Sequence, residues 1–267
     1  MTTTEYRHLH IGQSGAIARV TLARPEVRNA FSDEVIAELT RAFETLGRQE
    51  DVRAIVLAAE GPAFCAGADL NWMRRMADYS RAENVADAGR LAAMLRTLND
   101  CPKPTIARIQ GDVYAGGLGL VAACDVAVAV DTAAFCLSEV RLGLIPATIG
   151  PYVVRAMGER AARRYFVTGE RFGALEALRV GLVHEVVDFE QLDERLDAVL
   201  QAIAAAGPQA VAAGKRLVRD IAGRPIDDAL IASTVDAIAD IRASGEGREG
   251  VQAFLQKRKP AWLPAQG

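Results

Sequence analysis

The sequence predicts an α/β fold in which a largely parallel sheet is followed by a helical C-terminal part. In the first half of the chain, short apolar runs with strand character alternate with helical periodicity, which is typical of βαβ units. From about residue 147 the apolar pattern is almost wholly helical. We therefore expect an α/β core over residues 1–205 and a helical C-terminal region over residues 206–267.

The first expected elements are a strand and an amphipathic helix. The strand Ala16–Leu22 ends before Ala23-Arg-Pro25. Ser32 is the expected N-cap of the helix, because Asp33 and Glu34 then lie in its first turn, where acidic side chains favour the helix dipole. The apolar residues that follow recur at helical spacing and are Val35, Leu39, Ala42, Phe43 and Leu46.

Further strands are expected along the chain. Val52–Ala58 reads as a buried strand, and its expected partner is Thr105–Ile109, which follows the breaker Pro102-Lys-Pro104. Asp125–Val130 is a third buried strand, and Val183–Val187 is a short strand within the helical second half. A helix between Val52–Ala58 and Thr105–Ile109 is marked by Leu91, Met94, Leu95 and Leu98.

The composition is that of a soluble globular protein without a strong charge bias. Of the 267 residues, 51% are apolar and 24% are charged, which are ordinary proportions. Lys and Arg number 31 and Asp and Glu number 34, so the formal net charge of −3 gives no general attraction to nucleic acid or to a membrane. The N-terminus lacks an apolar signal core, and no apolar run approaches a membrane span. We expect a cytoplasmic protein with no nucleic-acid or membrane partner.

The four cysteines fit neither a CxxC metal pattern nor a short disulfide framework. They are Cys65, Cys101, Cys124 and Cys136, and three of them lie in apolar runs. Buried thiols without disulfides are therefore expected, which suits a reducing compartment. No metal site is expected.

Two small-residue turns carry the strongest functional signal. The segments Phe64-Cys-Ala-Gly-Ala-Asp-Leu70 and Gly111-Asp-Val-Tyr-Ala-Gly-Gly-Leu-Gly119 each stand where a strand is expected to lead into a helix. Such turns leave backbone N–H groups unpaired. Two turns that face one point would form an oxyanion hole from backbone alone.

The glycines of the second turn also match a dinucleotide-binding pattern. Gly117–Ala122 fits GxGxx(G/A), but Asp125 precedes the next strand, whereas that pattern requires an acidic residue at the strand's end. A dinucleotide site is therefore not expected. Two interpretations stay open: close packing of helix and sheet, or a helix N-terminus aimed at a developing negative charge.

A third segment, Ser138-Glu-Val-Arg-Leu-Gly-Leu-Ile-Pro146, supplies a carboxylate. Glu139 follows the apolar run Phe135–Leu137, so partial loss of hydration is expected to suit it for acid/base chemistry. The competing interpretation is a surface glutamate in a salt bridge.

Together these three segments resemble the crotonase (enoyl-CoA hydratase/isomerase) superfamily, over nearly the whole chain. The resemblance implies repeated ββα units with a helical C-terminal trimerisation region, and hence a homotrimer or a dimer of trimers. It implies an acyl-CoA substrate and no separate cofactor, because coenzyme A is part of the substrate. By the same resemblance, the N–H groups of Ala68 and Gly116 hold the thioester carbonyl, and Glu139 is the catalytic acid/base.

One residue departs from the two-glutamate hydratases of this superfamily. These enzymes carry a second glutamate in the segment that resembles Gly116–Leu120, and this chain has Gly119 there. Either Glu139 carries out both proton transfers or another group helps to hold the water. Tyr114 and Asp112 are weak candidates for that group.

The resemblance also implies contacts to coenzyme A and to the acyl chain. Basic residues near both ends of the chain would reach the phosphates of coenzyme A, and these are Arg24, Arg28 and Lys257. Ala66 and Asp69 of the first turn would also contact coenzyme A. The contact from the C-terminal residues sometimes comes from a neighbouring subunit. The expected acyl-pocket residues are Trp72, Arg74, Arg75 and Tyr114. A helix with Trp72 and Met76 facing the core is the competing interpretation.

The sequence thus predicts an acyl-CoA hydratase that adds water across a 2,3-enoyl-CoA double bond. The segment from Ser138 to Tyr165 looks most like bacterial 3-methylglutaconyl-CoA hydratases of leucine breakdown. One alternative is an enoyl-CoA isomerase that moves the double bond from position 3 to position 2 with a single glutamate. An alternative of another class is a non-catalytic CoA-binding or RNA-binding scaffold.

Overall fold

A computed structural model describes residues 6–263, in which the strands form two sheets. The large sheet consists, in spatial order, of β1 (Leu9–Ser14), β2 (Ile17–Leu22), β3 (Ala54–Ala59), β5 (Thr105–Ile109), β7 (Val126–Val130) and β10 (Glu185–Val187). The small sheet consists of β4 (Ala63–Cys65), β6 (Asp112–Tyr114), β8 (Ala134–Cys136) and β9 (Arg171–Gly173).

Both sheets are parallel except at one edge. In the large sheet only the β1–β2 hairpin is antiparallel, and in the small sheet only the β8–β9 pair is. Three successive strand pairs, β3/β4, β5/β6 and β7/β8, place one strand in each sheet. The helices that follow these pairs are α2 (Leu70–Ala77) with α3 (Arg81–Asn99), α4 (Gly116–Ala123) and α5 (Gly150–Thr168). This repeated ββα order confirms the expected fold class.

The buried strands of the large sheet were predictable because helices and the second sheet cover them. Each residue of β3 is buried, and β3 pairs in parallel with β5, as expected. Strands buried on both faces read as continuous apolar runs. The first helix, α1 (Asp33–Arg48), begins where predicted, since the Ser32 hydroxyl accepts a hydrogen bond from the Val35 N–H at 3.2 Å.

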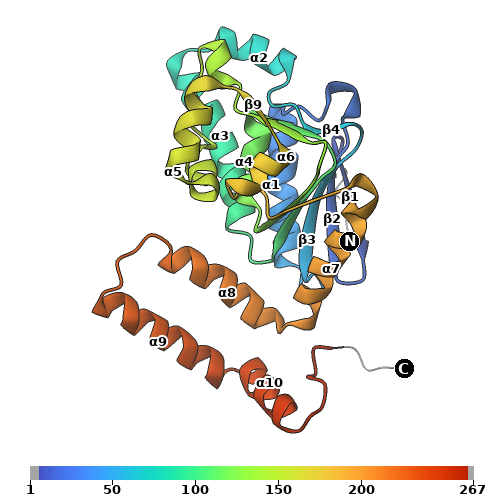
Figure 1. Ribbon diagram of the computed structural model, residues 1–267, viewed down its shortest axis with the longest axis vertical. Helices are drawn as coiled ribbons and strands as arrows, with labels where there is room; N and C mark the ends of the chain where they lie inside the picture. Colours follow the sequence, from blue (N-terminus) through green and yellow to red (C-terminus); the bar gives the residue numbers. More distant parts are fainter. Residues whose placement is uncertain (1–5, 264–267) are drawn as a thin grey trace.

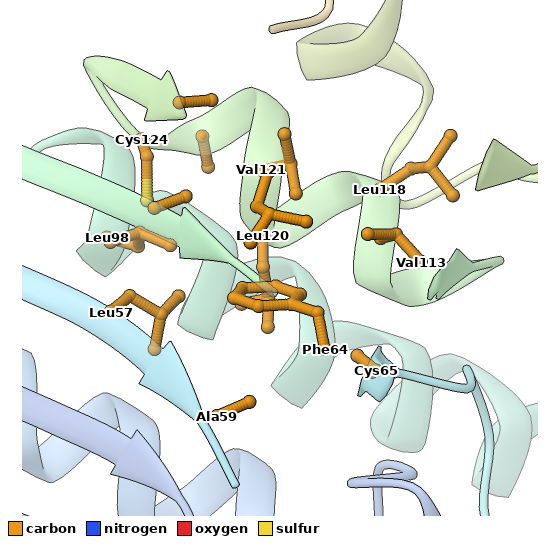
Figure 2. Close-up of a cluster of buried hydrophobic side chains, with 14 of the residues drawn as sticks. Leu57, Ala59, Phe64, Cys65, Leu98, Val113, Leu118, Leu120, Val121 and Cys124 are labelled. Carbon is orange, nitrogen blue, oxygen red and sulfur yellow. The ribbon is translucent and has the colours of Figure 1, made fainter. Parts of the chain in front are cut away.

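The main core fills the space between the sheets and α1, α3 and α4. Figure 2 shows the Phe64 ring of β4 between Leu57 of β3 and Leu120 of α4. Phe64 and these two leucines have no exposed surface. This packing fixes the end of β4, from which the first small-residue turn leaves.

Figure 1 shows that the last three helices extend from the core as an arm. After α6 (Ala174–Arg179) and the 3₁₀ turn η3 (Phe189–Gln191), α7 (Leu192–Ala205) packs on the large sheet. The arm, residues 208–255, comprises α8 (Pro208–Ile221), α9 (Asp228–Ala243) and α10 (Gly245–Leu255). Two ion pairs join α8 to the core: Lys215 with Asp125 at 2.7 Å, and Arg219 with Asp100 at 3.0 Å.

Two further expectations concern cysteines and membrane spans. All four cysteines are buried and unpaired, as predicted. Within residues 6–263, no individual helix has both the length and the apolar character of a membrane span; one pair, residues 189–205 with 208–221, reaches those limits only jointly and is bent by 107°.

Candidate active site

The first small-residue turn follows β4 and is held by Phe31. The Phe31 N–H donates to the Gly67 carbonyl at 2.6 Å, and the Asp69 N–H donates to the Phe31 carbonyl at 2.7 Å. In this parallel bridge Ala68 faces Phe31 without bonding to it, so the Ala68 N–H points to the opposite side. That N–H donates to no acceptor within residues 6–263. Gly67 has a φ of +91°, a backbone conformation that favours glycine.

The second turn lies between β6 and α4. The Ala115 N–H donates to the Cys136 carbonyl of β8 at 2.8 Å, and Ala115 adopts a φ of +46° that is unusual for a residue with a Cβ. The helix then begins at Gly116, whose N–H has no acceptor within its own helix. The second turn therefore presents a helix N-terminus, with the positive end of its dipole.

The two turns lie in contact with each other. A Cβ added to Gly67 would lie 3.0 Å from the Ala115 Cβ, and a Cβ added to Gly117 would lie 2.9 Å from the Cys65 Cβ. A Cβ on Gly116 would meet the ring of Phe31 at 2.8 Å, so the residue that holds the first turn also flanks the second. Small residues are required here because the backbones approach so closely. Two sets of unpaired N–H donors are thereby brought to one place.

Glu139 lies at the end of the strand next to the second turn. Tyr114 pairs with Cys136 in the β6–β8 register, and Glu139 opens the 3₁₀ turn η2 (Glu139–Leu142) three residues after Cys136. Its Oε2 atom is buried and has no hydrogen-bond partner within the described residues. Burial raises the pKa of Glu139 above its ordinary value. A salt-bridged surface glutamate, the competing interpretation, is therefore not what the structure contains.

Arg24 and Asp69 form a buried ion pair beside the first turn. The Arg24 Nη2 lies 2.9 Å from the Asp69 Oδ2, and its Nη1 donates to the Ala30 carbonyl at 3.0 Å. Asp69 also caps α2, because its Oδ1 accepts from the N–H groups of Asn71 and Trp72. Arg24 and Asp69, two of the residues predicted to contact coenzyme A, thus already bind other groups within the protein.

The other expected CoA contacts occupy different places. Arg28 is exposed, and its carbonyl accepts from the Ala66 N–H at 2.9 Å, so Arg28 lies beside the first turn. Lys257 follows α10 at the end of the arm. Figure 1 shows α10, which ends two residues before Lys257, and the β4 end of the core on opposite sides of the molecule, so α10 lies away from this chain's own candidate site.

The expected acyl-pocket residues on α2 have different surroundings. Trp72 is buried, with its Nε1–H donating to Asp87 at 3.3 Å, so it joins α2 to α3. Arg75 is paired with Asp33 at 2.6 Å, whereas the only partner of the Arg74 side chain within residues 6–263 is the neutral Asn71.

Of the two candidates for holding water, one is already engaged. Asp112 accepts from the Ala134 N–H at 3.0 Å and pairs with Arg171 at 3.1 Å, so it holds the small sheet together. Tyr114, Cys136 and Arg171 stand at neighbouring positions in the strand registers, so they share one face of that sheet. Its hydroxyl has no hydrogen bond within the described residues.

Sequence reasoning missed Ile149. This side chain fills the space next to Gly119, since a Cβ at Gly119 would lie 2.4 Å from the Ile149 Cγ2. The two residues are thirty positions apart, and no spacing rule connects them.

Within residues 6–263, no group of three or more His, Cys, Asp or Glu side chains could hold a metal ion.

Comparisons with known proteins agree with this geometry. The profile of the family described as "Enoyl-CoA hydratase/isomerase" matches residues 12–264. Enoyl-CoA hydratase ACTT6 of Alternaria alternata is 37% identical, with 94% of this chain and 82% of that protein covered. Human mitochondrial enoyl-CoA hydratase domain-containing protein 3 is 32% identical, with 97% and 84% covered.

Solved structures are similar over the same length. The crystal structure of an enoyl-CoA hydratase from Shewanella pealeana has a TM-score of 0.94 at 43% identity, with 97% of each chain covered. An enoyl-CoA hydratase from Mycobacterium smegmatis has a TM-score of 0.90 at 38% identity, with 96% of this chain and 98% of that chain covered.

Proposed function

This chain belongs to the enoyl-CoA hydratase/isomerase family, and we propose that it adds water across the 2,3-double bond of an enoyl-CoA. The observation that carries the proposal is the contact between two turns whose Ala68 and Gly116 N–H groups have no acceptor within residues 6–263, beside the half-buried Glu139, whose Oε2 is buried and has no partner within the same residues. A scaffold that only binds CoA has no use for such a carboxylate, because burying an unpaired acidic group costs stability.

The two amides would stabilise the negative charge that develops on the substrate. Addition of water to C3 makes the thioester oxygen enolate-like, and the N–H groups of Ala68 and Gly116 are the donors that would hold it. Their positions are fixed by the Phe31 bridge and by the start of α4, so little reorganisation is needed during the reaction. Loss of one such donor typically costs about 3–4 kcal/mol of transition-state stabilisation.

Glu139 would act on the attacking water. As a carboxylate it accepts a proton while the water oxygen bonds to C3, and as an acid it can return a proton to C2. Burial raises the pKa of Glu139 above its ordinary value, which is the direction that suits a general acid/base.

Coenzyme A would lie across the first turn and reach a neighbouring subunit. The exposed guanidinium of Arg28, beside Ala66, would bind a phosphate of coenzyme A. The Arg24–Asp69 ion pair would hold the first turn in place. Lys257 would contribute to a site only from another copy of the chain, because the arm carries it away from its own core.

We propose assembly as a homotrimer or a dimer of trimers. On α9, Ile231, Val235 and Ile238 are about half exposed, whereas Leu230 is buried. An apolar stripe on an extended arm requires a partner surface. Light scattering at micromolar concentration is expected to give three or six times the chain mass, and a stable monomer would refute the assembly.

A short acyl chain with an anionic end, such as a 3-methylglutaconyl or related branched chain, is the proposed substrate class. Arg74 supports this choice, because its guanidinium has no acidic partner among the described residues and suits a carboxylate. Arg75 is less suited, since Asp33 already neutralises it. A cytoplasmic location remains part of the proposal.

The alternative activity is double-bond isomerisation, which Gly119 favours because a single glutamate suffices for it. Absorbance of the conjugated thioester distinguishes the two reactions. A hydratase consumes this absorbance when given a 2-enoyl-CoA, and an isomerase creates it from a 3-enoyl-CoA. Higher kcat/KM for the 3-enoyl substrate would reverse our assignment.

A further inference from the structure

Ile149 closes the space beside Gly119 on the face of α4 that carries the candidate site. Gly119 lies three residues after Gly116, so the two share one face of the helix. A Cβ at Gly119 would lie 2.4 Å from Ile149 Cγ2, 2.9 Å from Ile149 Cβ and 3.3 Å from Leu95 Cδ2. Ile149 is 1% exposed and Leu95 is fully buried, so neither can swing into solvent. No residue larger than glycine fits at position 119 while Ile149 is present.

Ile149 is carried by the same loop that begins with Glu139. The backbone of this loop is held at both ends: the Leu144 N–H donates to the Glu139 carbonyl at 3.0 Å, and the Gly150 N–H donates to the Ala147 carbonyl at 3.3 Å. Ile149 then precedes α5, which packs against α4. One loop therefore supplies the carboxylate at its start and the apolar wall at its end.

The other acidic side chains of the two turns are already engaged. Asp112 is held by Arg171 and the Ala134 N–H, and Asp69 is held by Arg24 and the cap of α2. Glu139, by contrast, keeps a buried oxygen without a partner within residues 6–263.

We propose that Ile149 is a specificity-determining residue whose side chain, packed on Gly119, excludes a second carboxylate from the reaction centre and leaves Glu139 to make both proton transfers. This inference rests on the proposed function. In the hydration step, one O–H bond of water breaks and its proton passes to Glu139, while the oxygen bonds to C3. The proton then passes from Glu139 to C2, which regenerates the carboxylate and balances the addition.

The packing claim is tested by a double-mutant cycle on stability. Gly119→Ala is expected to lower the urea midpoint in the wild-type background, because its methyl group overlaps Ile149. In the Ile149→Gly background, which removes both Ile149 atoms nearest to that methyl group, the same change is expected to cost nothing or to raise the midpoint, because it fills part of the space left there. An equal loss in both backgrounds would overturn the inference. This arm is independent of activity, so it stands or falls apart from the proposed function.

The chemical claim is tested by placing a carboxylate in the opened space. The acid side of the wild-type kcat/KM profile is expected to show one ionisation. Gly119→Glu with Ile149→Gly is expected to add a second ionisation, and the matched pair Gly119→Gln with Ile149→Gly is not. The change across that ionisation is expected to be at least about tenfold, since a positioned acid or base contributes about 10²–10⁴-fold.

Two results would contradict this second claim. One is a folded double variant, Gly119→Glu with Ile149→Gly, whose profile matches that of the glutamine control. The other is a single Gly119→Glu variant that folds like wild type and already shows the second ionisation. Absence of any enoyl-CoA turnover by the wild-type protein would instead refute the proposed function, while the stability cycle would still decide the packing claim.

Discussion

The Arg24–Asp69 pair gives a sharp stability prediction, because the chain also contains a matched exposed pair. The side chains of Arg24 and Asp69 are 17% and 8% exposed, whereas those of Arg75 and Asp33 are 48% and 45% exposed. Asp69→Asn keeps an acceptor that can cap α2 but leaves the Arg24 guanidinium buried without a counter-charge. Loss of one partner of a buried ion pair costs about 3–5 kcal/mol.

The control variant breaks the exposed pair in the same way. Asp33→Asn is expected to cost at most about 1 kcal/mol, because water screens that pair. Urea unfolding followed by far-UV circular dichroism, at one protein concentration for all variants, measures both losses. If Asp69→Asn costs no more than Asp33→Asn, the pair does not support the first turn as argued.

The pH dependence of this loss follows from the pKa of Asp69. Burial raises that pKa, but the Asn71 N–H, the Arg24 guanidinium and the Trp72 N–H lower it further, so the net value lies below the ordinary one. The pair therefore stabilises the fold fully above the unfolded pKa of about 3.9, and this stabilisation is lost as the pH falls through the lower folded value. The difference between wild type and Asp69→Asn is expected to be constant near neutrality and to shrink below about pH 4.

The remaining predictions concern the first turn, substrate choice and pH. Gly67→Ala is expected to lower kcat by at least about tenfold. The added Cβ would lie 3.0 Å from the Ala115 Cβ on a backbone with a φ of +91°, so the turn must shift and move the Ala68 N–H with it. An unchanged kcat in steady-state assays would contradict this. Arg74→Ala is expected to reduce the preference for a glutaconyl-type CoA ester over crotonyl-CoA more than Arg75→Ala does, and equal kcat/KM for both esters in wild type would refute an anionic tail. Because burial raises the pKa of Glu139, the acid-side decline of kcat/KM is expected to begin at a higher pH than it would with a glutamate of ordinary pKa.

Sequence reasoning predicted the elements that are buried on both faces. The run at residues 54–59 is continuous and apolar, and the run at residues 105–109 is buried except at Arg108, because helices or the second sheet cover them. The strands of the small sheet, such as β4 and β8, are only three residues long, so they show no usable periodicity, and their role was not predicted. The hairpin partner β1 was also missed, because its residues are mostly exposed and polar.

The candidate site was predictable where its signal is local. The turns around Gly67 and Gly116 could be found because small residues mark close backbone approach, and the partial burial of Glu139 followed from the apolar run before it. The contacts of Asp69 with Arg24 and of Gly119 with Ile149 span 45 and 30 positions, so only the fold could bring them together. The roles of these residues in catalysis remain predictions.

The most direct test of the central claim is turnover of a conjugated 2-enoyl-CoA by wild type and by Glu139→Gln. The substitution keeps the size and hydrogen bonding of the side chain but removes the base, so the affinity for a CoA ester is expected to stay nearly unchanged while the loss of conjugated absorbance stops. Binding of an unreactive acyl-CoA, measured by calorimetry, controls for misfolding. A variant that binds normally and retains more than about a tenth of wild-type kcat, a loss below about 1.4 kcal/mol, would show that Glu139 is not the acid/base.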